Sequence, residues 1–233
     1  MERTSKLVLA VLLIVTFASA QSFRFDDNSD WWSLLRVDEP MPEPSRIATP
    51  PTNFNILGLT LLDDNLFDAV TKRLGETRRV ERGDAATGRE QLCYVSQDGA
   101  VHLIFEQGEV ESSFYLFRGG PPWRGSDQCR RSPTVTANVS TASGLRLGMT
   151  IAEVRRVLGS PSQCLKDKVI YARETRKKTP AKLLEEIRKN DPHHYSDEEF
   201  HRQFDFYDES VYIEARFVHS VLIYLAVSQS GTT

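Results

Sequence analysis

One feature of the sequence most constrains the fold: the spacing of hydrophobic residues changes from helical to strand-like twice along the chain. The first half opens with apolar residues at helical spacing: Leu66, Phe67, Val70 and Leu74. Strand-like runs follow, separated by Asp98-Gly99 and Gln107-Gly108, as hairpin turns separate strands. The second half repeats the order, with a helical pattern over 151–158 and β-branched and aromatic residues over 204–227. Each half is therefore predicted to place a helix before antiparallel strands.

We accordingly expect an α+β fold of two tandem units, each with N-terminal helices packed on an antiparallel sheet of three or four strands. The units are predicted over 54–118 and 144–233. Residues 119–143 between them are rich in Gly, Pro, Ser and Thr and lack apolar periodicity, which predicts a linker. Within the second unit, residues 179–204 predict a helical insertion, because Thr-Pro favours a helix start and Asp-Pro a stop.

The N-terminal residues 1–20 predict a signal peptide. Arg3 and Lys6 precede an apolar run over 7–17, and Ala-Ser-Ala at 18–20 fits a small-residue cleavage site. A run of about eleven apolar residues is too short to cross the ~30 Å of bilayer hydrocarbon. The proline-rich residues 21–53 are predicted to be a leader. We therefore expect the mature chain in the periplasm or outside the cell, with no stable membrane insertion.

The three cysteines, Cys93, Cys129 and Cys164, have to be interpreted for an oxidising compartment. One disulfide and one leftover thiol are expected there. Three pairings are possible, and we favour Cys93 with Cys129 because both lie in or beside the same predicted sheet. The sequence has no CxxC pair and no histidine near a cysteine at ligand spacing. A cysteine metal site or a reactive thiol is therefore the less favoured interpretation.

Charge and composition limit the class of partner. The chain has 29 Lys and Arg against 32 Asp and Glu, a formal net charge of −3. Nucleic-acid binders usually carry a basic excess, so we do not expect nucleic acid as a partner. Hydrophobic residues make up 40% of the chain, which is enough to fill a core and argues against disorder.

A short motif at the start of the second half resembles a known family. Gly148-Met149-Thr150 is followed at fixed spacing by Val154, Leu158-Gly159 and Pro161. This Gly-Met-Thr-x-x-x-Val-x-x-x-Leu-Gly-x-Pro pattern is similar to the opening of the SmpA/OmlA family, small outer-membrane lipoproteins of the barrel-assembly machinery. Two helix-plus-sheet units in one secreted chain also resemble the tandem architecture of the β-lactamase inhibitor protein. The resemblance implies a tandem fold in an envelope or secreted protein.

Catalytic and cofactor-binding motifs are absent from the sequence: it has no Gly-x-Ser-x-Gly, no phosphate-binding Gly-rich loop and no His-Glu-x-x-His. One cluster could bind a metal. Asp197 and His201 lie four apart on a predicted helix, and His193 or His194 could reach them from the preceding turn. The alternative is an acidic first helical turn, favoured by the helix dipole, with exposed histidines. We favour that alternative and predict neither a metal nor a cofactor.

Aromatic side chains are the candidate contact residues. They lie on predicted strands or nearby loops: Tyr115, Trp123, Tyr207, Tyr212 and Tyr224. Such residues dominate interface energetics, although strand alternation should bury about half of them. We therefore predict a non-enzymatic protein-binding module, such as an inhibitor or an envelope-associated factor, that contacts a protein partner through its sheet faces and helical insertion. The alternative prediction is a secreted metal-dependent hydrolase that uses residues 193–201.

Overall fold

The structure is a computed structural model that describes residues 42–46, 53–82, 88–119, 128–191 and 193–232. The predicted signal peptide, nearly all of the predicted leader and Trp123 lie outside these residues. Within the described ranges, no helix combines the length and the apolar character needed to cross a membrane.

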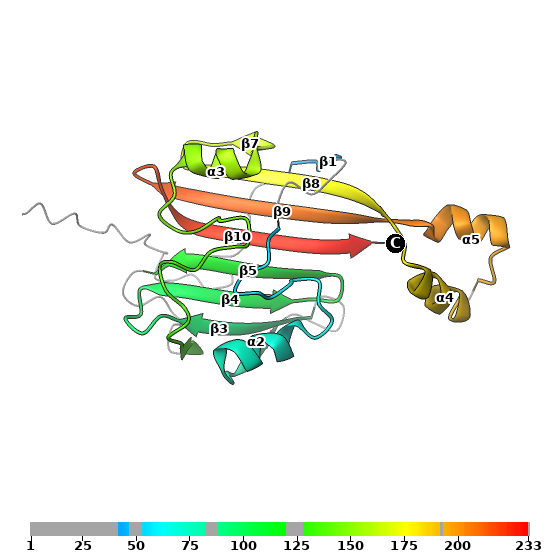
Figure 1. The fold of residues 1–233 in the computed structure, drawn as a ribbon, viewed down its shortest axis with the longest axis horizontal. Coiled ribbons are helices and arrows are strands. Elements are labelled where there is room, and N and C mark those ends of the chain that lie inside the picture. The colour runs from blue at the N-terminus through cyan, green and yellow to red at the C-terminus, as the bar shows by residue number, and fades with distance from the viewer. Residues whose placement is uncertain (1–41, 47–52, 83–87, 120–127, 192, 233) are drawn as a thin grey trace, which may run out of the picture.

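One ten-stranded sheet dominates the fold (Figure 1). Its strands are β1 (Ser45–Arg46), β2 (Arg79–Arg82), β3 (Arg89–Val95), β4 (Val101–Gln107), β5 (Glu111–Arg118), β6 (Arg130–Arg131), β7 (Gln163–Cys164), β8 (Lys168–Lys178), β9 (Phe206–Val218) and β10 (Val221–Thr232). The order across the sheet is β1-β8-β9-β10-β5-β4-β3-β2, with β7 on β8 and β6 on β3. All pairs are antiparallel except β1 with β8 and β6 with β3.

The expectation of two tandem helix-on-sheet units is wrong, because the strands of both halves join one sheet. β5 from the first half pairs with β10 from the second over a seam that runs from Phe117↔Tyr224 to Glu111↔Ser230. Two separate sheets would each expose a long apolar edge strand at this position, and an unpaired edge is a template for aggregation. Pairing β5 with β10 satisfies the backbone groups of both edges.

The hydrophobic core is also continuous across the two halves. It combines sheet residues with the inward faces of α2 (Leu66–Leu74) and α3 (Ile151–Leu158), which lie on the same face of the sheet (Figure 1). Between the halves, Val135 and Val139 are buried in that same core. The described part of the segment predicted as a linker is therefore packed against the common core.

Local sequence signals explain where α3 begins and ends. Thr150 caps α3 with a complete capping box: its hydroxyl accepts from the Glu153 N–H at 3.3 Å, and Glu153 accepts from the Thr150 N–H at 2.7 Å. Gly159 then ends the helix with a positive φ of 78°, a conformation that favours glycine. Because these signals lie within one turn of each helix end, the sequence predicts α3 correctly.

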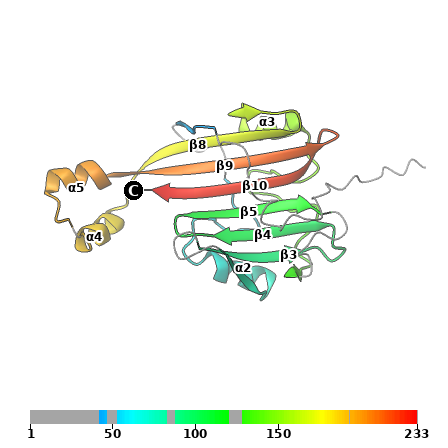
Figure 2. The ribbon, with the colours of Figure 1, turned by 180° about the vertical axis from the view of Figure 1, so that it is seen from behind.

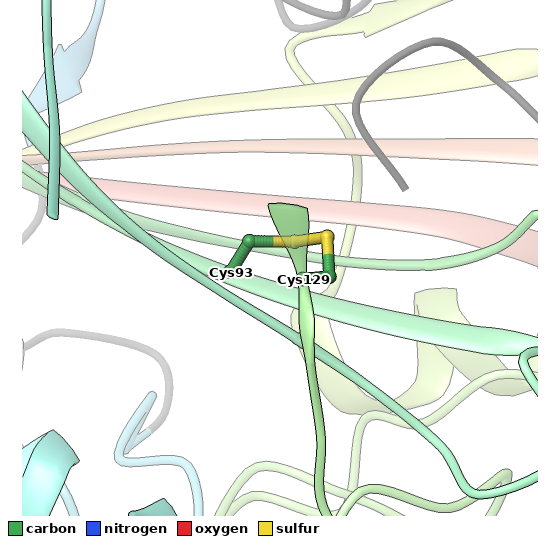
Figure 3. The surroundings of a disulfide bond; sticks show 2 residues. All are labelled: Cys93 and Cys129. Atoms are coloured by element: carbon green, nitrogen blue, oxygen red, sulfur yellow. A yellow bond between two sulfur atoms is a disulfide. The ribbon is translucent and has the colours of Figure 1, made fainter. Parts of the chain in front are cut away.

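The opposite face of the sheet has none of the described helices on it (Figure 2). Its buried side chains form a second cluster that includes Tyr115, Phe117 and Tyr224. The disulfide between Cys93 and Cys129, the pair favoured from the sequence, lies on this face and joins residues 36 positions apart (Figure 3). Cys164 is free and exposed.

Two helices project beyond the end of the sheet. β8 and β9 are long strands, and between them the chain forms α4 (Ala181–Lys189) and α5 (Asp197–Phe204), which extend past the sheet in both views (Figures 1 and 2). These helices occupy the segment predicted as a helical insertion. We call residues 179–205 the arm.

Candidate functional site

The arm is closed at its base by a hydrogen bond across the two strands that carry it. The Thr179 N–H donates to the Asp205 carbonyl at 2.8 Å, directly after the Lys178↔Phe206 pair that ends the β8–β9 ladder. Ser196 starts α5 with a second capping box, in which its hydroxyl and the Glu199 carboxylate exchange hydrogen bonds with each other's backbone N–H groups. The base of the arm is therefore tied to the ends of β8 and β9, and α5 has a capped start.

Arg188 on α4 holds the two arm helices together. Its guanidinium donates to the Tyr195 carbonyl at 2.8 Å and pairs with the Asp197 carboxylate. The same group lies 4.3 Å from the centroid of the Phe200 ring. Phe200 in turn packs against Phe204, with 5.0 Å between ring centroids. This small cluster is the arm's own core, and Phe200 is its one fully buried residue on α5.

The turn between the helices is built on Asp191. Its carboxylate accepts hydrogen bonds from the backbone N–H groups of His193, His194 and Tyr195 at 2.8–3.0 Å. Desolvation acts to raise the pKa of Asp191, but the three donors outweigh it and leave the pKa below its ordinary value. The carboxylate therefore stays ionised and fixes the turn at neutral pH.

An open groove of about 570 Å³ lies between the arm helices. Its lining residues are Leu183, Glu186, Ile187, Asn190, Asp191, His193, Tyr195, Gln203 and Phe204, and we call this set the groove. Leu183 is 38% exposed, and no residue of α4 is fully buried. The apolar residues Leu183 and Ile187 of α4 therefore face an accessible space instead of a core.

Two of the four metal candidates have polar side-chain contacts with other residues. Asp197 is ion-paired with Arg188, and His201 Nδ1 lies 2.7 Å from the Asp205 carboxylate. The backbone N–H groups of His193 and His194 are bound to Asp191. In the part of the chain that the structure describes, no three His, Cys, Asp or Glu side chains lie close enough together to hold a metal ion.

Three of the candidate contact tyrosines lie on the sheet face opposite α2 and α3. Tyr115 and Tyr224 are 6% and 1% exposed, and Tyr212 on β9 is half-buried. Burial raises the pKa of Tyr224, and burial together with the Glu106 carboxylate raises the pKa of Tyr115. Because both rings are buried, neither is accessible to a partner's side chains.

A polar network accompanies these tyrosines. Glu106, 3% exposed, accepts from the Arg89 guanidinium at 2.7 Å, from the Gln91 amide and from the Tyr115 hydroxyl at 3.2 Å. The paired and hydrogen-bonded state is what makes a buried carboxylate tolerable. These residues therefore stabilise the sheet from its second face.

The remaining candidates have different positions. Tyr207, half-buried, lies at the start of β9 opposite Lys177, next to the arm. The residue that sequence reasoning missed is its neighbour Phe206, which is 46% exposed. No local sequence signal could have found it, because the β8–β9 pairing brings Phe206 to Arg176, whose guanidinium lies 5.3 Å from the ring centroid.

Comparisons with known proteins do not assign the chain to a family. No protein-family model matches it, and no characterised protein matches its sequence. One solved structure, described as belonging to the GntR family of transcriptional regulators, is 13% identical over 82% of this chain, with a TM-score of 0.20. The matched region spans 66% of that structure's chain. A similarity at this level carries no argument about function.

Proposed function

We propose that the mature chain is a secreted or periplasmic protein-binding module without a catalytic role, and that it engages its protein partner through the groove of the arm. An inhibitor or an envelope-associated factor would both fit this class.

The incomplete burial of the apolar stripe of α4 is the observation that carries the proposal. Leu183, Leu184 and Ile187 recur on one side of the helix, yet none of them is fully buried. Helices of eight or nine residues are too short to be stable in water on their own and normally depend on packing of an apolar face. α4 extends past the sheet that could have covered its stripe. A stripe presented in this way matches helix-lined grooves that receive partner side chains.

The alternative of a metal-dependent hydrolase receives no support from the described arrangement. That mechanism requires Asp197 and His201 at one ion with a third ligand, and among the described residues no three such side chains lie close enough together. Asp197 and His201 are instead paired with Arg188 and Asp205. The contacts around these four residues instead fix the shape of the arm.

A quantitative pull-down with matched variants tests the proposal. Leu183→Asp places a charge in the groove, whereas Leu62→Asp makes the same change at a leucine that is also 38% exposed but lies before α2. The bait is the mature chain, and the prey is the native envelope and secreted fraction. We expect a protein, a second copy of the chain included, that is retained by wild type and Leu62→Asp and lost by Leu183→Asp. Equal recovery by all three baits would contradict the arm as the binding site.

A further inference from the structure

Two of the four large exposed apolar side chains lie in the arm or directly beside it. Among the described residues, four such side chains are more than a third exposed: Leu62, Val110, Leu183 and Phe206. Leu183 lines the groove, and Phe206 is the first residue after the arm. Two chemically different apolar surfaces therefore lie at the same end of the molecule.

The surface around Phe206 is an aromatic side chain flanked by cations. Lys178 is directly opposite Phe206 in the β8–β9 ladder, and Arg176 lies two positions before Lys178 on the same face. The Arg176 guanidinium covers part of the Phe206 ring at 5.3 Å, yet the ring keeps 46% exposure. We call Arg176, Lys178 and Phe206 the Phe206 patch. Asp208, opposite Arg176, contributes one negative charge beside it.

The groove has the complementary chemistry. Its apolar lining comes from Leu183, Ile187, Tyr195 and Phe204. Its charged lining residues are both acidic, Glu186 and Asp191. Glu186 is 58% exposed and keeps only a weak 3.8 Å contact with Lys182, so its carboxylate is accessible to a second cation. An apolar groove with an acidic rim fits an apolar side chain that is flanked by basic residues.

We infer, as a refinement of the proposed function on which it rests, that the partner of the groove is a second copy of this chain, whose Phe206 patch enters it. The groove and the patch are adjacent along the chain, at residues 183–204 and 176–206. In a two-fold pairing of arms, a contact between one copy's groove and the other copy's patch forms twice. In that pairing the Phe206 ring meets the apolar lining, and Lys178 and Arg176 face the acidic rim.

Sedimentation of the mature chain over a range of concentrations tests the dimer. The experiment uses Cys164→Ser as the parent protein, so that an intermolecular disulfide cannot produce the larger species. We expect a concentration-dependent doubling of mass in the parent. Leu183→Asp and Phe206→Asp should each raise the dimer dissociation constant roughly tenfold or more. Leu62→Asp, with the same leucine exposure, should leave it unchanged.

Mixing the two disrupted variants separates a groove-to-patch contact from any other interface. Leu183→Asp alone and Phe206→Asp alone have no intact contact in a symmetric dimer. Their mixture has one, between the groove of the Phe206→Asp copy and the patch of the Leu183→Asp copy. We expect measurable heterodimer in the mixture. In a separate charge-reversal test, Glu186→Lys should weaken self-association, and adding Lys178→Glu to the same chain should partly restore it.

Each result decides between the second copy and another protein. A parent that stays monomeric at every concentration, or a mixture that associates no better than either variant, would overturn the inference. If the monomeric parent protein still captures a different protein, and Leu183→Asp abolishes that capture, the proposed function stands with a partner other than a second copy. If Leu183→Asp changes neither self-association nor capture of another protein, both the inferred dimer and the proposed function are contradicted.

Discussion

Leu225→Ala tests whether the two halves unfold as one body. Leu225 on β10 is directly opposite Leu116 on β5, across the seam that joins the halves. Both side chains are fully buried at 0% exposure and belong to the core that α2 and α3 share. Removing three carbon atoms from such a site costs the transfer free energy plus the cavity that remains, in total about 2–5 kcal/mol for a buried leucine. A domain with a stability of about 5–15 kcal/mol stays folded after that loss.

Native-state hydrogen exchange measures where the loss is felt. Because one sheet and one core connect both halves, the slowest amides of β3 and β4 should lose as much protection as those of β8 and β9, about 3 kcal/mol in each. Val110→Ala, at a turn residue that is 60% exposed, is the control and should change neither set by more than about 0.5 kcal/mol. If β3 and β4 kept wild-type protection while β8 and β9 lost theirs, the halves would be separate units and our account of the seam would be refuted.

Three further changes have defined outcomes. Thr150→Ala removes the cap of α3 and should lower the free energy of unfolding by about 1 kcal/mol in urea titrations; no change would show that the cap is redundant. Replacing both Cys93 and Cys129 by Ala opens a loop closed over 36 positions and should cost about 4 kcal/mol under oxidising conditions; reducing agent should then affect the variant less than the wild type. Burial lowers the pKa of His102 to about 4. Below about pH 6.5 the imidazole is therefore protonated in the unfolded chain but stays neutral in the folded chain. The free energy of unfolding is therefore unaffected by this group above pH 6.5 and decreases as the pH falls toward 4. His102→Gln should make the decrease between pH 7 and 4.5 smaller by about 2–3 kcal/mol. If the variant and the wild type lost the same stability over this range, the buried neutral ring would be contradicted.

Features set by neighbouring residues were predictable from the sequence. The start of α3 at Thr150, the hairpin turn at Asp98-Gly99 and the helical arm each depend on signals within a few positions of one another. Capping groups and turn glycines act locally, so a pattern in the sequence is enough to locate them.

The joining of the halves was not predicted, because strand pairing across more than a hundred residues leaves no local signal. One indication was present. The run Phe114–Phe117 on β5 and the run 222–227 on β10 are apolar at every position, and all of these residues are buried. Continuous apolar strands are typical of sheet centres with both faces covered, whereas an edge strand of a small unit should alternate.

The candidate site was predicted only in part. The stripe of Leu183, Leu184 and Ile187 predicts an amphipathic helix, but the sequence does not show that this helix extends beyond the core that could cover it. Tyrosine is a residue type enriched at interfaces, yet Tyr115 and Tyr224 are buried. The sequence could not predict this, because side-chain alternation along a strand does not show which sheet face is covered. The exposure of a side chain depends on the whole fold, so only the structure distinguishes exposed contact residues from buried ones.

The most direct test of the central claim is photo-cross-linking from the groove. A benzophenone amino acid replaces Gln203, an exposed lining residue on α5, and in a matched control it replaces exposed Arg146, in the loop before α3. Irradiation in the native secreted or envelope fraction should give a discrete protein adduct from position 203, and Leu183→Asp in the same chain should abolish that adduct. No adduct from position 203, or the same adduct from both positions regardless of Leu183, would contradict a protein-binding role for the arm.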